Sequence, residues 1–156
     1  KHYAAVAKLP TIADDGGFEI DALGGAPGVT SHRWIYGDRE NTDDELISYT
    51  MEKMKAVPMA RRGAQLRLVL AFTTVDGTVA TTEASVRGVV AEKPSALRTE
   101  GFPYRALLYL PEIKKFYDHA VLTDAETDRF NHRKRAVELL KPKILALLTT
   151  PIKDVQ

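Results

Sequence analysis

Two adjacent aspartates, Asp14 and Asp15, are the residues whose types and spacing most directly indicate chemistry. They follow a short apolar segment, residues 9–13, that predicts a buried strand, and they precede two glycines that predict a turn. Paired carboxylates are a common way to hold Mg²⁺ beside a phosphate chain, because hard cations prefer oxygen ligands. Side chains alternate across a strand, so we expect one aspartate to face the site and the other to brace the turn or reach the metal through water. The alternative is that both are turn formers that bond to their own backbone.

The glycines Gly16 and Gly17 follow the acid pair directly. Exposed backbone N–H groups in a glycine-rich turn can cradle phosphate oxygens, because no side chain stands in the way. The alternative is a simple tight turn with no ligand.

A second group with donor chemistry is His132 followed by Arg133, inside a predicted helix. A histidine can donate to a carbonyl oxygen on a base, and an arginine can fork onto carbonyl or phosphate oxygens. The alternative is a solvated basic helix face that continues through Lys134 and Arg135.

Two aromatic residues, Phe102 and Tyr104, lie beside a glycine and a proline. An aromatic ring can stack on a nucleobase, a contact worth roughly 1–3 kcal/mol. The alternative is an aromatic strand end that packs into the core, and this alternative has more weight for Tyr104 than for Phe102.

These motifs together resemble the inosine triphosphate pyrophosphatase family. Family members carry Ala-Asp-Asp-Ser-Gly followed by Asp-Ala-Leu-Gly-Gly-Ala-Pro-Gly, and this chain has Ala-Asp-Asp-Gly-Gly at residues 13–17 and the same eight residues at 21–28. Asn-His-Arg at residues 131–133 resembles the family's Ser-His-Arg, and Gly-Phe-Pro-Tyr-Arg at residues 101–105 resembles its Gly-Phe-Gly-Tyr-Asp.

The resemblance implies an α/β fold of the ITPase-like (Maf/Ham-type) class, with an elongated, twisted mixed sheet flanked by helices. It implies Mg²⁺-dependent hydrolysis of non-standard purine nucleoside triphosphates (ITP, dITP and XTP type) to the monophosphate and pyrophosphate, and a homodimer. It also implies that Asp15 is the catalytic or metal-binding carboxylate, with Asp14 in support. The substrate-binding residues that it implies are Gly16, Gly17, Phe102, Tyr104, His132 and Arg133.

Three of the departures from the family pattern fall at positions that are normally functional. Gly16 replaces the usual serine, Thr127 replaces a lysine, and Arg105 replaces the aspartate that helps to read the purine edge. These departures support an alternative function, a non-catalytic nucleotide-binding or assembly protein on the same scaffold. Because Arg105 inverts a charge, base preference is the property that the resemblance predicts least well.

The amino-terminal part of the family has no counterpart in this sequence. Members usually open with a strand and a phosphate-binding loop, Thr-Gly-Asn-x-x-Lys, and Lys1 aligns just beyond the lysine of the helix that follows. We expect residues 1–156 to form one domain that lacks this strand and loop, either as a portion of a longer protein or as a divergent relative. A missing central strand would leave a sheet edge exposed.

Composition narrows the function classes further. The chain has 156 residues, an ordinary length for one domain, and a net charge of +1, which produces no global field that attracts nucleic acid or an anionic membrane surface. No apolar stretch approaches the roughly 20 residues that span a bilayer, so we expect a cytoplasmic protein without a membrane partner. A nucleic-acid site at residues 129–135 is disfavoured because the charges are few and lack interleaved aromatics.

Local signals predict most of the elements that position these residues. Residues 1–8 read as the last turns of a helix, and two capping boxes, at Thr42 and Thr123, open helices that we expect to run to Ala56 and Leu148, the second with a break near Pro142. An Asp-Gly pair at residues 76–77 predicts a hairpin. The remaining predicted strands are residues 65–73, 79–90 and 104–110.

Overall fold

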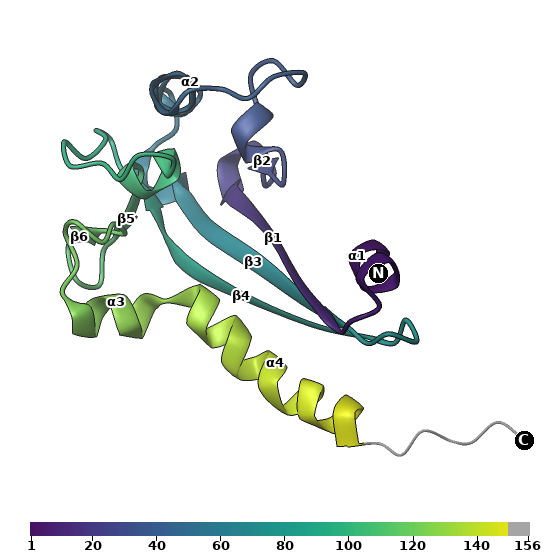
Figure 1. Cartoon of the computed structure of the whole chain (residues 1–156). Helices are drawn as coiled ribbons and strands as arrows, with labels where there is room; N and C mark the ends of the chain where they lie inside the picture. The colour runs from purple at the N-terminus through teal and green to yellow at the C-terminus, as the bar shows by residue number, and fades with distance from the viewer. Residues whose placement is uncertain (150–156) are drawn as a thin grey trace, which may run out of the picture. The chain divides into compact units, whose positions relative to one another are not determined.

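The computed structural model describes residues 1–149, and Figure 1 traces the order of its elements. The sheet has the strand order β2-β1-β3-β4-β5-β6. The helices are α1 (His2–Ala7), α2 (Asp43–Met54), α3 (Asp124–Phe130) and α4 (His132–Thr149). The strands are β1 (Thr11–Ile20), β2 (Pro27–Gly28), β3 (Gly63–Thr73), β4 (Val79–Val90), β5 (Leu108–Leu110) and β6 (Lys115–Phe116).

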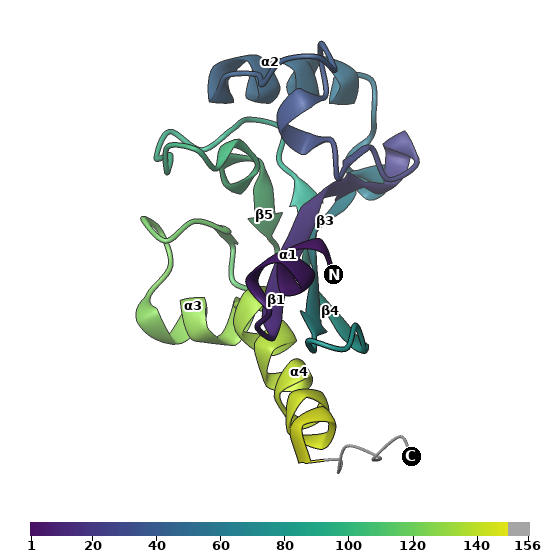
Figure 2. The same ribbon diagram turned by 45° about the vertical axis from the view of Figure 1, so that its right-hand side comes forward.

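The chain divides into two compact units. Unit 1 contains residues 1–15, residues 68–84 and the described chain from His132 onward, and unit 2 contains residues 16–67 and 85–131. Strands β1, β3 and β4 each begin in one unit and end in the other. Figure 2 shows each of the three strands as a continuous ribbon. The prediction of one domain over residues 1–156 stays a prediction, and its last seven residues lie outside the described part of the chain.

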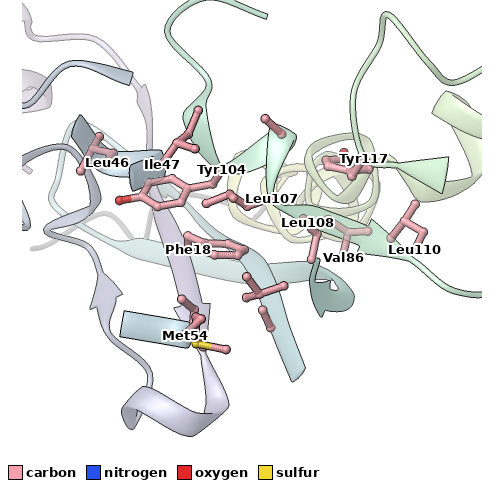
Figure 3. Close-up of a cluster of buried hydrophobic side chains, with 14 of the residues drawn as sticks. Phe18, Leu46, Ile47, Met54, Val86, Tyr104, Leu107, Leu108, Leu110 and Tyr117 are labelled. Carbon is pink, nitrogen blue, oxygen red and sulfur yellow. The ribbon is translucent and has the colours of Figure 1, made fainter. Parts of the chain in front are cut away.

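Unit 2 contains the larger hydrophobic core (Figure 3). Phe18 of β1 stacks on Tyr104 with ring centroids 4.8 Å apart, and both rings are buried. Helix α2 covers them with the buried side chains of Leu46, Ile47 and Met54. The end of β1 and the segment that follows Phe102 are therefore held by the same packing.

The capping box at Thr42 explains where α2 begins. The Thr42 hydroxyl accepts from the Glu45 backbone N–H at 3.2 Å, and the Glu45 carboxylate accepts from the Thr42 N–H at 2.8 Å. These bonds satisfy two N–H groups that the first helical turn leaves open. The predicted start is confirmed, and the helix ends at Met54.

A buried arginine, Arg62, joins α2 to the sheet in unit 2. Its guanidinium donates to the carbonyl oxygens of Met54 and Val57 at 2.8 and 3.2 Å, and to those of Val90 and Ala91 at 2.8 and 2.9 Å. An arginine has five N–H donors in a fixed plane, so one side chain can satisfy several carbonyl oxygens that would otherwise be buried without partners.

Unit 1 is organised by α4 against β3 and β4. Ala136 and Leu140 of the helix pack against a row of buried residues on β3, and the Thr82 hydroxyl donates to the Ala136 carbonyl oxygen at 3.0 Å. Lys143 donates to the Thr81 carbonyl oxygen at 2.7 Å. The β3 residues in this row are Leu68, Leu70 and Phe72.

The structure corrects the predicted position of the break in the second capped helix. The helix break falls at Asn131, which has extended backbone angles, and α4 continues through Pro142. Contacts on both sides of Pro142, at buried Leu140 and at Lys143, hold the helix across the hydrogen bond that proline removes.

The predicted strand at residues 104–110 is also shorter than expected. Residues Pro103–Ala106 form a 3-10 helix, and β5 begins only at Leu108.

Within residues 1–149, no helix combines the length and the apolar character that crossing a membrane requires.

Candidate functional site

The two acidic residues lie inside strand β1, so the predicted buried strand that ends in a glycine-rich turn is wrong. Residues 12–16 are exposed, and the strand continues to Ile20. The glycines belong to the strand because β2 approaches β1 closely at this point. A Cβ on Gly17 would clash with the carbonyl oxygen of Gly28, so only glycine lets the two strands meet. Phosphate binding by the N–H groups of Gly16 and Gly17 stays a prediction.

Asp14 meets Arg133, which is 119 residues away in the sequence. The Arg133 guanidinium donates to an Asp14 carboxylate oxygen at 2.5 Å. Both side chains are about half exposed, at 43% and 59%. The structure thus brings together the acidic strand and the histidine-arginine motif within unit 1.

Arg133 and His132 occupy the first turn of α4. His132 is half-buried and opens the helix directly after the extended residue Asn131. The Asp14 carboxylate contacts the guanidinium of Arg133, a side chain of the first turn of this 18-residue helix. Arg133 is exposed, as on a basic helix face, and its charge also has a specific partner on β1.

Asp15 is adjacent to Asp14 in the same strand and is also exposed. Adjacent strand residues direct their side chains to opposite faces of the sheet, so the two carboxylates do not share one face. Among residues 1–149, no cluster of three or more histidines and acids is arranged to hold a metal alone. This donor set fits Mg²⁺ bound through one carboxylate together with substrate phosphates, which is a common way for proteins to bind that ion.

Phe102 belongs to unit 2 and is 50% exposed. The Arg105 guanidinium carbon lies 4.1 Å from the centroid of the Phe102 ring, a cation–π contact. In the described part of the chain, this ring is the contact that the Arg105 guanidinium makes, and no carboxylate pairs with it. An exposed aromatic ring next to an arginine is a surface on which a flat base can stack.

Tyr104 has a different role from Phe102. Its side chain is 4% exposed, and its hydroxyl donates to the Ser31 carbonyl oxygen at 2.7 Å. Burial raises the pKa of the Tyr104 phenol above its usual range, so the group stays protonated. We assign the Tyr104 side chain a packing role in place of the predicted substrate contact.

The segment that carries Phe102 is tied to the start of α2. The Gly101 N–H donates to an Asp43 carboxylate oxygen at 2.8 Å, and Arg98 pairs with Asp44. Behind it, buried Asp118 accepts from the Thr99 hydroxyl at 2.8 Å. Sequence reasoning missed these supports, because Asp43 and Asp44 read only as favourable acids in the first turn of a helix.

Two cavities lie apart from the residues that the sequence singled out. One, of about 300 Å³, is in unit 1, and one, of about 420 Å³, is in unit 2. The first is lined by Val69, Thr81, Thr82, Glu83, Leu139 and Lys143. The second is lined by Met59, Val89, Ala91, Glu92, Tyr109, Pro111 and Phe116.

Comparison with known proteins connects this chain to one family. The sequence model of the Ham1 family matches residues 1–143. The chain is 37% identical to a dITP/XTP pyrophosphatase of Escherichia coli, over 90% of this chain and 69% of that protein. It is 39% identical to a dITP/XTP pyrophosphatase of Thermus thermophilus, over 89% of this chain and 64% of that protein.

Solved structures agree with the sequence comparison. The Ham1 protein of Staphylococcus aureus superposes with a TM-score of 0.77 at 27% identity, and the match covers 93% of this chain and 72% of that one. A Ham1 protein of Coxiella burnetii also superposes with a TM-score of 0.77, at 28% identity. The predicted fold class and family are confirmed, and the chain belongs to the Ham1 family.

Proposed function

We propose that this chain is a nucleoside triphosphate pyrophosphatase that hydrolyses non-standard purine nucleoside triphosphates of the ITP, dITP and XTP type. The observation that carries the proposal is the meeting of strand β1 and the first turn of α4 at Asp14 and Arg133. Both residues belong to unit 1, which supports a site that combines acids for a metal with donors for a nucleotide. The names of the E. coli and T. thermophilus relatives support the same substrate class.

In the proposed reaction, Asp15 holds the metal or accepts a proton from the attacking water. The water oxygen bonds to the α-phosphorus while the bond from that phosphorus to the α–β bridging oxygen breaks. The products are the nucleoside monophosphate and pyrophosphate. A divalent metal, when bound, offsets the negative charge on the phosphate oxygens, and we propose Mg²⁺ in this role.

The remaining residues bind the nucleotide. Phe102 stacks on the base, and His132 and Arg133 donate to its acceptor atoms. The Gly16 and Gly17 N–H groups contact the phosphate chain. A homodimer and a cytoplasmic location stay predictions.

The test is pyrophosphate release from ITP, dITP and XTP beside dATP and dGTP, in the presence of Mg²⁺. The Asp15→Asn variant should lose nearly all release, and Asp38→Asn, which removes an exposed loop carboxylate, should keep it. Undiminished release by Asp15→Asn would contradict the assigned role of Asp15.

The departures at Gly16 and Arg105 favour a second candidate, a nucleotide-binding protein without turnover. It predicts that the protein binds inosine or xanthosine monophosphate but releases no pyrophosphate from any triphosphate. Calorimetric titration with the monophosphates, run beside the release assay, separates the two functions.

A further inference from the structure

The acid pair does not act as one metal-binding unit, because its members face opposite sides of β1. Asp14 and Asp15 are consecutive in an uninterrupted strand, so a single ion cannot take a ligand from each without distorting the strand. Their neighbours also separate them. The Asp14 carboxylate is bonded to the Arg133 guanidinium, and a metal ion bound to Asp14 would lie beside that cation and be repelled by it.

The backbone of Arg133 is already held in place by the rest of α4. One turn further along the helix, Ala136 is fully buried and its carbonyl oxygen accepts from the Thr82 hydroxyl. The second anchor is Leu140, which is also buried. These anchors do not fix the conformation of the long Arg133 side chain, which has many rotamers.

Asp14 restricts that freedom. It accepts from one terminal nitrogen of Arg133, and in the described part of the chain the Arg133 side chain has no other partner. An arginine has five N–H donors, so most of the fork stays available for a ligand that offers oxygen or nitrogen acceptors. A guanidinium that is oriented in advance loses less entropy when it binds.

We infer that Asp14 is a positioning residue that orients the Arg133 guanidinium for the nucleotide. The inference rests on the proposed nucleotide site. It makes specific the supporting role that the sequence resemblance implies for Asp14.

The test is a double-mutant cycle on nucleotide binding, which needs neither metal nor turnover. Inosine monophosphate is titrated calorimetrically into the full chain and into the Asp14→Asn, Arg133→Gln and doubly substituted proteins. Each single change should weaken binding about tenfold, and the double change should weaken it no more than Arg133→Gln alone, because coupled neighbours are not additive. Additive losses would overturn the inference, and so would no binding by the unsubstituted chain.

A second measurement separates positioning from metal binding. The affinity for Mn²⁺ is measured in the presence of a non-hydrolysable triphosphate, from the loss of the spectroscopic signal of the free ion. This affinity should be unchanged in Asp14→Asn and strongly reduced in Asp15→Asn. Equal reductions in both variants would overturn the inference.

A matched control addresses a merely structural role. Lys143→Gln removes a different link of α4 to the sheet, the bond from Lys143 to the Thr81 carbonyl oxygen of β4. It should lower the melting temperature without changing the affinity for inosine monophosphate, whereas Asp14→Glu should retain most of that affinity. If Asp14 and Arg133 are coupled in nucleotide binding but the protein releases no pyrophosphate, the proposed enzyme is refuted and the inference is supported. If the protein releases pyrophosphate but the two residues are not coupled, the proposed enzyme is supported and the inference is refuted.

Discussion

Phe102 and Tyr36 are two half-exposed aromatic residues of unit 2 that share a local arrangement. Each ring carries an arginine guanidinium, Arg105 at 4.1 Å from the Phe102 centroid and Arg39 at 3.9 Å from the Tyr36 centroid. They differ in what surrounds them. Arg39 is also paired with Glu45 at 2.7 Å, whereas Arg105 has no acidic partner in the described chain. Only the Phe102 pair therefore offers both a ring and uncommitted donors.

This difference makes Tyr36 a control for Phe102. Phe102→Ala should weaken the binding of inosine monophosphate by about 5- to 150-fold, the equivalent of the roughly 1–3 kcal/mol of one base–aromatic stack. The melting temperature should change little, because the ring is half exposed. Tyr36→Ala should leave the affinity unchanged. Equal losses in both variants, measured by calorimetry, would show that neither ring is specific to the nucleotide.

At the scale of elements, α3 is stabilised by a charged capping box. The Glu126 carboxylate accepts from the Thr123 N–H at 2.8 Å and from the Lys115 ammonium at 2.7 Å. These bonds lower the pKa of Glu126 from 4.5 to about 2, and the bond from Lys115 has the largest effect. The capping box thus joins the start of α3 to β6.

The lowered pKa of Glu126 predicts a pH-dependent contribution to stability. The folded state holds the Glu126 proton less tightly than the unfolded state, so the contribution is complete above pH 4.5 and disappears as the pH falls toward about 2. Glu126→Gln should therefore lower the urea midpoint at pH 7, and its difference from the unsubstituted chain should shrink between pH 4.5 and 2. Glu138→Gln, an exposed change on α4, should show no such trend. A difference that is constant with pH would contradict the prediction.

The hydrogen bonds of Arg62 predict that the stability of the contact between α2 and the sheet depends strongly on this one side chain. Arg62→Met removes the donors to four carbonyl oxygens in a buried position, and each unsatisfied acceptor costs about 1–3 kcal/mol. We expect the free energy of unfolding to fall by at least about 3 kcal/mol. Arg61→Met, at the exposed neighbouring position, should have little effect. Urea unfolding of both variants checks this, and a loss under about 1 kcal/mol in Arg62→Met would contradict it.

At the scale of the whole molecule, two hydrophobic cores share three continuous strands. Leu70 belongs to the unit 1 core and Leu108 to the unit 2 core, and both are buried. Because β1, β3 and β4 run through both units, opening one unit frays strands that the other requires. This continuity supports the prediction of one domain.

A pair of core substitutions tests that prediction. Leu70→Ala and Leu108→Ala should each cost about 2–5 kcal/mol and should each shift one common unfolding transition. Tryptophan fluorescence reports on Trp34 in unit 2, and far-ultraviolet circular dichroism reports on the whole chain. If Leu70→Ala moved the circular dichroism transition while the fluorescence transition stayed in place, the units would be separate domains.

The features that the sequence alone determined are local ones. Both capping boxes, the hairpin at Asp76 and Gly77, and the strand from Val79 to Val90 are present as predicted. Each depends on residues a few positions apart, whose side chains and backbone bond to one another wherever the segment lies in the fold. The family also follows from short motifs, because their residues are contiguous.

The tertiary structure alone decided what distant segments do to one another. Gly17 is a strand residue because Gly28 approaches it, Tyr104 is buried because Phe18 stacks on it, and α4 passes Pro142 because contacts hold both sides. The pairing of Asp14 with Arg133 joins residues 119 positions apart, and no local pattern encodes such a contact. The sequence indicated candidate residues for the chemistry, and only the folded chain paired Asp14 with Arg133.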